Sequence, residues 1–341
     1  MWEQIITRLP HPTLLLSPAG QILAANTMSG DLFGPDLVGR GYLVALRHPK
    51  LVDAIESCLS EKSPTEARFE IVQMHTNRSL HAQCDPVEGA GVHVLVQFQD
   101  LSDFSQNMQM KRDFVANVSH ELKSPLTAMS GFIETLQGPA KDDPETRTRF
   151  LGIMSDETGR MSRMVDDLLS LSRLEQDSRR RPSTRVDIAE ILQSVVMHMS
   201  PRAKDVGMAL NLDVADAVFK CRADKDQVRQ VFTNLIDNGL KYGRSDRGLC
   251  IGISCVNTDI HVSGPAIRAD FQDFGNGFDP VHIPRLGERF YRIDSHRARH
   301  EGGTGLGLAI VKHILNRHRG ALRIQSEMGK GSMFSVIIPT T

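Results

Sequence analysis

The sequence contains no apolar run long enough to cross a bilayer as a helix, which takes about 18 consecutive residues. Its opening segment, Met1 to Arg8, is too polar to be a signal peptide. We therefore expect a soluble, cytoplasmic chain without a membrane span of its own. A membrane anchor removed from the natural chain, or membrane association through a partner, stays open as an alternative.

The chain also has few cysteines and almost no net charge. The chain has five cysteines, an odd number, and no CxxC pair, which argues against a disulfide framework and against a structural zinc site. The 40 basic and 41 acidic residues leave a formal net charge of -1, so nothing points to nucleic acid or an anionic membrane as a partner. A short basic cluster, Arg179 to Arg181, precedes Pro182 and is interpreted as a solvated hinge.

Apolar residues, by contrast, are plentiful. They make up 40% of the 341 residues, against 24% for the charged residues. A chain of this length and composition predicts two or three domains with packed cores and excludes wholesale disorder.

The first hundred residues predict a small α/β module. The expected elements are strands at 13–16 and 21–26, a helix at 51–59, and strands at 69–74 and 92–98. This order of elements resembles a PAS domain, a family whose members can hold haem, flavin or a small ligand, and His48 and Cys84 are the residues that suggest such a site. We interpret both as structural.

A long helix is predicted from about residue 101 to 137, and it carries His120. Its apolar residues step by three and four positions and form one stripe, and His120 lies about 200° from Val118, away from that stripe. A lone surface histidine is usually only solvated, but an exposed imidazole followed by the carboxylate of Glu121 suits nucleophilic chemistry. Pro125 removes one backbone donor inside the helix and should bend it. The stripe consists of Phe114, Val118, Leu122, Pro125, Met129, Phe132 and Leu136.

A second helix fits residues 144–175, whose apolar positions form a heptad-like seam. Two helices joined by a short loop cannot bury both stripes alone, whereas pairing of two chains into a four-helix bundle would bury them. The alternative is a hairpin packed on another domain of the same chain; we favour the homodimer. The seam is Leu151, Met154, Thr158, Met161, Val165 and Leu168.

Polar residues on a later amphipathic helix, 224–242, suggest a nucleotide and magnesium site. Asn234 and Asn238 are four residues apart and share one face, with Lys241 nearby. Amide oxygens are hard ligands that suit Mg²⁺, and a lysine at a helix end can meet a phosphate. Taken alone the signal is weak, because Asn and Lys are common on surfaces.

Two glycine-rich segments follow. Asp273 begins the segment Asp-Phe-Gly-Asn-Gly, in which the carboxylate can accept a hydrogen bond from an adenine amino group and the glycines admit a ring. Residues 302–308 form a glycine loop that opens an apolar helix, where backbone amides bind phosphates. Neither a Rossmann fingerprint nor a P-loop fits, because Leu308, Ile310 and Ile324 occupy positions that those motifs reserve for small residues.

Together these segments resemble the conserved boxes of sensor histidine kinases, in the order of that family. The resembling segments are 114–127 (H box), 234–242 (N box), 273–277 (G1 box), 288–292 (F box) and 302–308 (G2 box). The N-terminal module is similar to PAS domains, with Gly20, Ile22 and Asn26 in the expected positions and Ser17 in place of the usual Asp. The residues around His120, together with Gly131 to Pro139, resemble those of the phosphate-regulon (PhoR-type) sensor kinases, which usually carry membrane helices.

The resemblance implies a multidomain α+β fold. It divides the chain into a PAS-like sensor domain (1–100), a dimerisation and histidine phosphotransfer hairpin (101–178), a linker (179–185) and a catalytic ATP-binding domain (186–341). The last is expected to be an α/β sandwich of the histidine kinase and Hsp90-like type.

The resemblance also implies residue roles. His120 would take the phosphoryl group of Mg-ATP, Glu121 would orient the ring and take its proton, and Ser124 would position a water in a phosphatase reaction. The phosphoryl group would then pass to an aspartate of a response regulator receiver domain, in phosphate-starvation signalling. Asn238 is expected to coordinate Mg²⁺, and the other nucleotide-lining residues to be Asn234, Lys241, Tyr242, Asp273, Gly275, Gly277, Tyr291, Gly303, Thr304, Gly305, Leu306 and Gly307. Arg297 and Arg299, in the expected lid, either help to hold phosphates or are surface charge.

Two other classes of function stay open. One is an ATPase of the same nucleotide-binding fold, such as a chaperone or topoisomerase relative, against which the H box argues. The other is a phosphatase-biased or silent scaffold that controls a response regulator through the PAS module and bundle. The complete N, G1 and G2 boxes argue against a silent scaffold.

Overall fold

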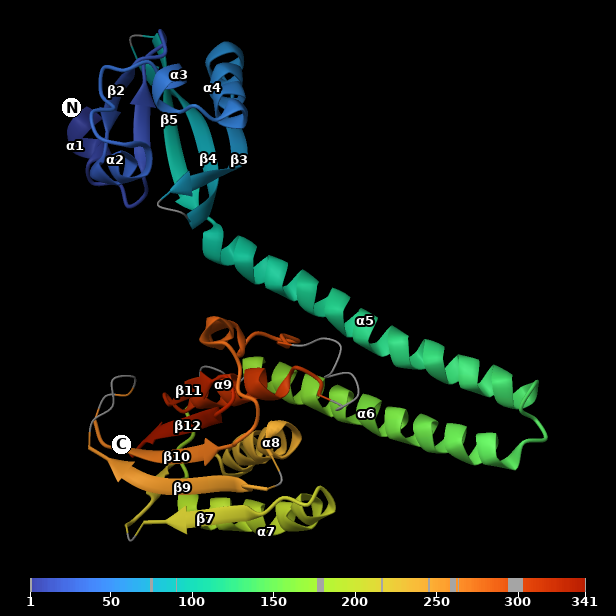
Figure 1. Cartoon of the computed structure of the whole chain (residues 1–341). Coiled ribbons are helices and arrows are strands. Elements are labelled where there is room, and N and C mark those ends of the chain that lie inside the picture. The colour runs from blue at the N-terminus through green and yellow to red at the C-terminus, as the bar shows by residue number, and fades with distance from the viewer. Residues whose placement is uncertain are drawn as a thin grey trace. The chain divides into compact units, whose positions relative to one another are not determined.

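The computed structural model describes residues 2–73, 76–89, 91–176, 181–215, 217–244, 246–257, 262, 264–293 and 303–340. The chain divides into two compact units, residues 1–116 and 117–341, and each is described by itself (Figure 1). One continuous helix, α5 (Ser102–Gln137), begins in the first unit and ends in the second.

The first unit is built on an antiparallel five-stranded sheet in the order β2-β1-β5-β4-β3. Its elements are α1 (Trp2–Ile6), β1 (Thr13–Leu16), β2 (Ile22–Ala25), α2 (Thr27–Phe33), α3 (Tyr42–Ala45), α4 (Pro49–Glu61), β3 (Thr65–Gln73), β4 (Thr76–Gly89) and β5 (Gly91–Asp100). Apolar residues of α4 and of the sheet form its core, in which Leu51 and Ile55 are fully buried. The predicted α/β module is confirmed, and its assignment to the PAS family stays a prediction.

His48 and Cys84, the two residues of this unit that suggest a ligand site, both make packing contacts. The His48 ring lies 4.8 Å from the ring of Phe69, measured between centroids. Cys84 is fully buried, and this burial raises the pKa of its thiol to about 12. Nδ1 of His48 is buried without a hydrogen-bond partner among the described residues, and the structural interpretation of both side chains stays a prediction.

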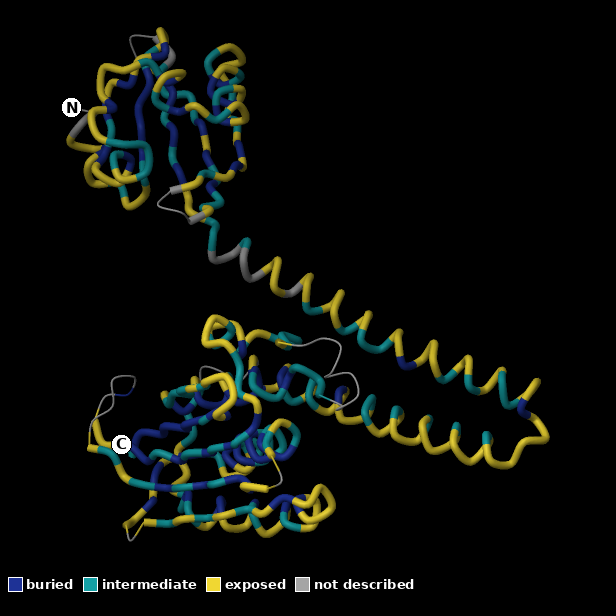
Figure 2. The backbone as a smooth tube through the Cα atoms, viewed as in Figure 1, coloured by how far each residue is buried: buried dark blue, intermediate teal, exposed yellow. Residues whose placement is uncertain are grey.

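The second unit begins with a helical hairpin made of the later part of α5 and of α6 (Pro144–Gln176). The two helices meet through the rings of Phe132 and Phe150, whose centroids are 4.8 Å apart, and through Thr158, whose hydroxyl lies 3.6 Å from the sulfur of Met129. Both helices were predicted within two residues of these bounds, and α5 continues through Pro125. Figure 2 shows that much of their surface is exposed.

The predicted orientation of α5 is confirmed. The residues of the apolar stripe from Phe114 to Leu136 are buried or half-buried, whereas His120 is exposed, as is Ser124 one turn later. The helix therefore presents the imidazole on the side that does not pack against α6.

The remainder of the second unit is an α/β sandwich. Its sheet has the order β11-β12-β10-β9-β7, with only β7 and β9 parallel among these described strands, and α7, α8 and α9 pack against it (Figure 1). The elements are β6 (Arg185–Asp187), α7 (Ile188–Asp205), β7 (Leu210–Val214), β8 (Lys220–Arg222), α8 (Lys225–Tyr242), β9 (Leu249–Val256), β10 (Ala266–Gln272), η1 (Pro280–Arg285), α9 (Gly307–Arg317), β11 (Ala321–Glu327) and β12 (Gly331–Pro339). β6 pairs with β8 and begins one residue inside the predicted linker.

His318 joins the end of α9 to the start of α8. Its Nε2 accepts the backbone N–H of Asp224 at 3.0 Å, and its Nδ1 lies 2.7 Å from the carbonyl oxygen of Ile314. Because one nitrogen accepts and the other donates, the ring is neutral. Burial is the main reason that the pKa of His318 is lowered, with the nearby Arg317 guanidinium as a smaller cause.

We expect this histidine to make folding sensitive to acid. Between the ordinary value of 6.5 and the lower folded pKa, the unfolded chain binds a proton that folded His318 cannot take up without losing a hydrogen bond. The free energy of unfolding should therefore fall as the pH drops below 6.5, by at most about 1.4 kcal/mol per pH unit from this group.

Urea unfolding followed by circular dichroism at about pH 5.5 and about pH 7.5 measures this component. His318→Gln should reduce the difference between the two pH values. His198→Gln, at an exposed position on α7, is the matched control and should keep it. An unchanged difference in the His318 variant would contradict the assignment.

Candidate functional site

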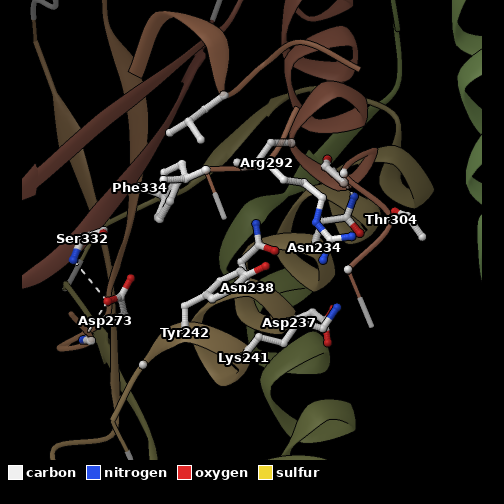
Figure 3. A pocket seen from close by; sticks show the side chains of 18 of the residues that line it. Asn234, Asp237, Asn238, Lys241, Tyr242, Asp273, Arg292, Thr304, Ser332 and Phe334 are labelled. Atoms are coloured by element: carbon white, nitrogen blue, oxygen red, sulfur yellow. Dashed lines mark hydrogen bonds and ion pairs between the residues drawn. The ribbon is translucent and has the colours of Figure 1, made fainter. Parts of the chain in front are cut away.

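A cavity of about 740 Å³ lies beside α8, the loop before α9 and the end of β10 (Figure 3). Twelve of the residues predicted to bind a nucleotide line it: Asn234, Asn238, Lys241, Tyr242, Asp273, Gly275, Gly277, Tyr291, Gly303, Thr304, Gly305 and Gly307. Leu306 does not, because its side chain is fully buried and its backbone N–H donates to the hydroxyl of Thr304 at 3.2 Å. Arg297 and Arg299 lie outside the described residues.

Helix α8 supplies the polar side chains at one end of the cavity. Its N-cap Asp224 accepts the N–H groups of Asp226 and Gln227, which fixes where the helix begins. Asn234 donates from its amide to the carbonyl of Gly307 at 3.2 Å and so ties α8 to the start of α9. Asn238, one turn later, extends into the cavity (Figure 3).

Two residues that were not predicted complete the charge arrangement on this side. Asp237 lies 2.6 Å from Lys241 Nζ through one carboxylate oxygen and 2.6 Å from Arg202 Nη2 through the other. All three line the cavity. Asp237 lies between the two asparagines in the sequence and four residues before Lys241. Helical spacing alone could therefore have predicted that Asp237 pairs with Lys241. Arg202 comes from α7, and no local pattern indicated it.

Asp273 lies at the opposite end of the cavity and is nearly buried. Its Oδ1 accepts the backbone N–H groups of Gly275 at 2.9 Å and Ser332 at 3.2 Å. Burial raises the pKa of this carboxyl, and the two hydrogen bonds oppose that shift. Neither bond uses Oδ2, which leaves one oxygen of the carboxylate as an acceptor for a ligand.

Backbone contact requires glycine at several positions of the lining, of which Gly275 and Gly305 are two. A Cβ on Gly275 would lie 1.9 Å from the carbonyl oxygen of Tyr242, so a side chain would force β10 away from α8. Gly305 has a φ of 70°, and a Cβ there would lie 2.9 Å from Cα of Phe290. The loop before α9 is in addition held by the N–H of Phe290, which donates to Gly305 O at 2.9 Å.

Tyr291 is the predicted aromatic residue of the cavity wall. Its hydroxyl lies 2.7 Å from Nδ1 of His282, and the Arg285 guanidinium stacks 4.2 Å from its ring centroid. Both partners belong to η1. The side chain therefore anchors η1 beside the cavity.

Helix α6 also borders the cavity, through Arg163, Asp166 and Asp167. The hydroxyl of Thr304 donates to Asp167 Oδ2 at 2.9 Å, and burial raises the pKa of Asp167. Nothing in the sequence distinguished this aspartate from other charged residues of the helix.

His120 does not line the cavity; it lies on the helical hairpin with its two predicted neighbours. Ser124 donates its hydroxyl to the carbonyl of His120 at 3.2 Å. Glu121 Oε2 lies 3.6 Å from Nη2 of Arg160 on α6. The carboxylate beside the imidazole is thus in contact with the second helix.

The lining is suited to a divalent ion that arrives with a ligand. Asn238 offers an amide oxygen, whereas no cluster of three or more His, Cys, Asp or Glu side chains exists within the described ranges. A hard cation here would need its other ligands from phosphate oxygens and water, as is usual for Mg²⁺ with nucleotides.

Comparison with known proteins identifies both parts of the second unit. Residues 110–177 match the His Kinase A (phospho-acceptor) domain, and residues 223–341 match the family of histidine kinase-, DNA gyrase B- and HSP90-like ATPases. The phosphate regulon sensor protein PhoR of Pseudomonas aeruginosa is 36% identical over 336 residues, which are 98% of this chain and 73% of that protein. The chain belongs to the sensor histidine kinase family. As a sensor histidine kinase of a two-component system, it is a protein-histidine kinase that uses ATP.

Other relatives agree with this assignment. The sensor protein SrrB of Staphylococcus aureus is 30% identical over 344 residues, 99% of this chain but 55% of that protein. A solved histidine kinase, ThkA in complex with the response regulator protein TrrA, has the same fold, with a TM-score of 0.52, 20% identity, and coverage of 99% of this chain and 98% of that one. Within the described part of this kinase, no helix combines the length and the apolar character needed to span a membrane.

Family membership removes one of the two functions left open, and the scaffold remains to be tested. A chaperone or topoisomerase type of ATPase is excluded, because the phospho-acceptor module lies in the same chain as the ATPase module. The predicted fold of helical hairpin plus α/β nucleotide domain is confirmed. The roles of individual residues stay predictions.

Substitution of Gly275, whose backbone lies against the carbonyl of Tyr242, tests whether the cavity binds ATP. Gly275→Ala should weaken ATP binding by about tenfold or more, equivalent to about 1.4 kcal/mol, because the new Cβ displaces the segment that holds Asp273. Gly252→Ala, in β9, is the matched control, since a Cβ there meets nothing within 4 Å. Titration with a fluorescent ATP analogue measures both variants, and equal affinities would refute the role given to this contact.

Proposed function

We propose that this kinase phosphorylates itself on His120 from Mg-ATP held in the cavity, and then passes the phosphoryl group to an aspartate of a response regulator receiver domain. The observation that supports the proposal is the combination of two sites in one unit. One is an exposed imidazole beside a carboxylate. The other is a cavity with two asparagines, a glycine loop and a carboxylate that uses only Oδ1 in its hydrogen bonds to the described residues.

The cavity residues divide between base and phosphates. Asp273 accepts the adenine amino group on Oδ2, while Gly275 and Gly277, which have no room for a side chain, place their backbone beside the ring. At the other end, Lys241 and the backbone amides before α9 bind the phosphate oxygens. Asn238 would hold Mg²⁺, which would neutralise charge on the phosphates, and Asn234 would line the nucleotide.

The chemical step takes place at the unprotonated ring nitrogen of His120. Its lone pair forms a bond to the γ-phosphorus while the bond from phosphorus to the bridging oxygen of ADP breaks in line. Glu121 orients the imidazole and accepts the proton from the other ring nitrogen. Because His120 lies on the exposed face of α5, the same nitrogen is reachable by an incoming receiver aspartate.

Ser124 supplies a phosphatase function in this proposal. Its hydroxyl lies one turn after His120 and now donates to the carbonyl of that residue at 3.2 Å. Rotation about χ1 would release it to hold a water for attack on a phosphorylated receiver. The balance of the two activities would set the output of the kinase.

The acting species is a homodimer. Five large apolar side chains of the hairpin are 43–53% exposed within one chain: Leu126, Ile133, Leu151, Val165 and Leu169. Pairing of two hairpins into a four-helix bundle would remove them from water. The 36% identity with PhoR supports phosphate limitation as the signal, and the use of ATP supports a cytoplasmic location for the reaction.

Labelling with ATP tests whether His120 is the phosphoacceptor. With γ-labelled ATP and Mg²⁺, the wild-type chain should acquire acid-labile, base-stable phosphate, and His120→Gln should acquire none. His198→Gln, another exposed histidine, should be labelled like the wild type. Stoichiometric acid-labile label on the His120 variant would show that the site is wrong. ATP binding with no label on the wild type would instead favour the scaffold alternative.

The second prediction concerns the cation. In the wild type, Mg²⁺ should strengthen ATP binding, whereas Asn238→Ala should bind ATP equally with Mg²⁺ and with EDTA. Asn316→Ala, at an exposed position of α9, is the matched control. An Mg²⁺ response of wild-type size in the Asn238 variant would remove this residue from the metal site.

A further inference from the structure

Arg160, on α6, is a cation in the helical hairpin that the proposed chemistry does not use. Its side chain is 15% exposed in a hairpin whose surface is otherwise largely open. Nη1 lies 3.3 Å from Glu157 Oε1 on the same helix, and Nη2 lies 3.6 Å from Glu121 Oε2 on α5. The guanidinium is therefore placed between a carboxylate of its own helix and the carboxylate beside His120.

The contact between Arg160 and Glu121 is incomplete as it stands. A distance of 3.6 Å is beyond the usual range of a hydrogen bond. In addition, Nε of Arg160 is buried and has no hydrogen-bond partner within the described residues. A buried donor left without an acceptor costs free energy, so the arrangement favours any movement that supplies one.

Glu121 is the carboxylate placed to supply it. A shift of a few tenths of an ångström would bring Glu121 within bonding distance of Nη2, and a carboxylate can take Nη2 and Nε of one guanidinium as a fork. Glu157 pairs with Nη1, on the other side of the guanidinium, and so restrains the Arg160 side chain from turning toward solvent. One carboxylate thus fixes the arginine, and the arginine fixes the other carboxylate.

We propose that Arg160 is a positioning residue for autophosphorylation: it orients Glu121 so that this carboxylate meets the ring N–H of His120. The inference rests on the proposed function, in which Glu121 accepts that proton. Among the described residues, Arg160 pairs with Glu121 and Glu157 and is not part of the cavity lining, so in this proposal it acts through Glu121.

A purely structural salt bridge between the two helices is the competing explanation, and a double-mutant cycle separates the two. The four proteins are the wild type, Glu121→Gln, Arg160→Gln and the double variant. Each variant is therefore also unfolded in urea. A structural bridge lowers the free energy of unfolding in both single variants together with the rate of labelling, whereas a positioning residue lowers the rate of labelling with the free energy of unfolding unchanged, and only while Glu121 is present.

The rate of acid-labile label on the full chain at saturating Mg-ATP is the readout. We expect Arg160→Gln to lower this rate about tenfold with an unchanged KM for ATP, and Glu121→Gln to lower it further. The double variant should match Glu121→Gln. Arg160→Lys should recover part of the loss, because lysine restores the charge but not the fork.

The control is Arg149→Gln, an exposed arginine of α6 that stacks on Phe150, and it should keep the wild-type rate. Equal losses from Arg160→Gln in both backgrounds, or no loss at all, would overturn the inference. If Arg160→Gln fails to fold, Arg160→Lys decides in the same cycle. Absence of label at His120 in the wild type would overturn the proposed function itself, which is a separate result.

Discussion

The nucleotide half of this kinase depends on one buried carboxylate and the backbone packed around it. Asp273 is held through Oδ1 by the N–H groups of Gly275 and Ser332, which belong to different strands and loops. The same point is where Gly275 meets the carbonyl of Tyr242 at the end of α8. The end of β10, the start of β12 and the end of α8 therefore share a single junction, and the two asparagines of α8 take their positions from it.

Burial at this junction has an electrostatic cost, because desolvation raises the pKa of Asp273. Two backbone donors offset part of that cost without satisfying the second oxygen. The carboxylate is consequently a stronger acceptor for a ligand donor than an exposed aspartate would be. The charge of Lys241, by contrast, is compensated within the protein. Asp237 pairs with Lys241 through one oxygen and with Arg202 through the other.

Local patterns were enough for the helices and for much of the cavity wall. Helical spacing located α5, α6 and α8 and the exposed side of His120, because each of these depends on residues three or four apart. Resemblance to family motifs predicted twelve lining residues from four separate segments, and of the predicted residues only Leu306 does not line the cavity.

Contacts between side chains from distant segments could not be predicted in this way. Arg202 reaches Asp237 from α7, and Asp167 reaches Thr304 from α6, so these contacts depend on how the helices pack. Strand β4 was missed because only Leu80, Ala82 and Cys84 of its fourteen residues are buried apolar positions, within a mostly polar segment.

The presence of α6 in the cavity wall has a consequence for inhibitor chemistry. A compound that occupies the cavity beside Asp273 alone contacts residues of the nucleotide domain. A compound that extends to the other wall meets Asp166 and Asp167, two carboxylates supplied by the phosphotransfer hairpin rather than by the nucleotide domain. A cationic substituent of suitable length would pair with them and would draw Asp167 into its charged form despite its burial. The boundary with α6 therefore offers contacts that a nucleotide domain without this hairpin does not have.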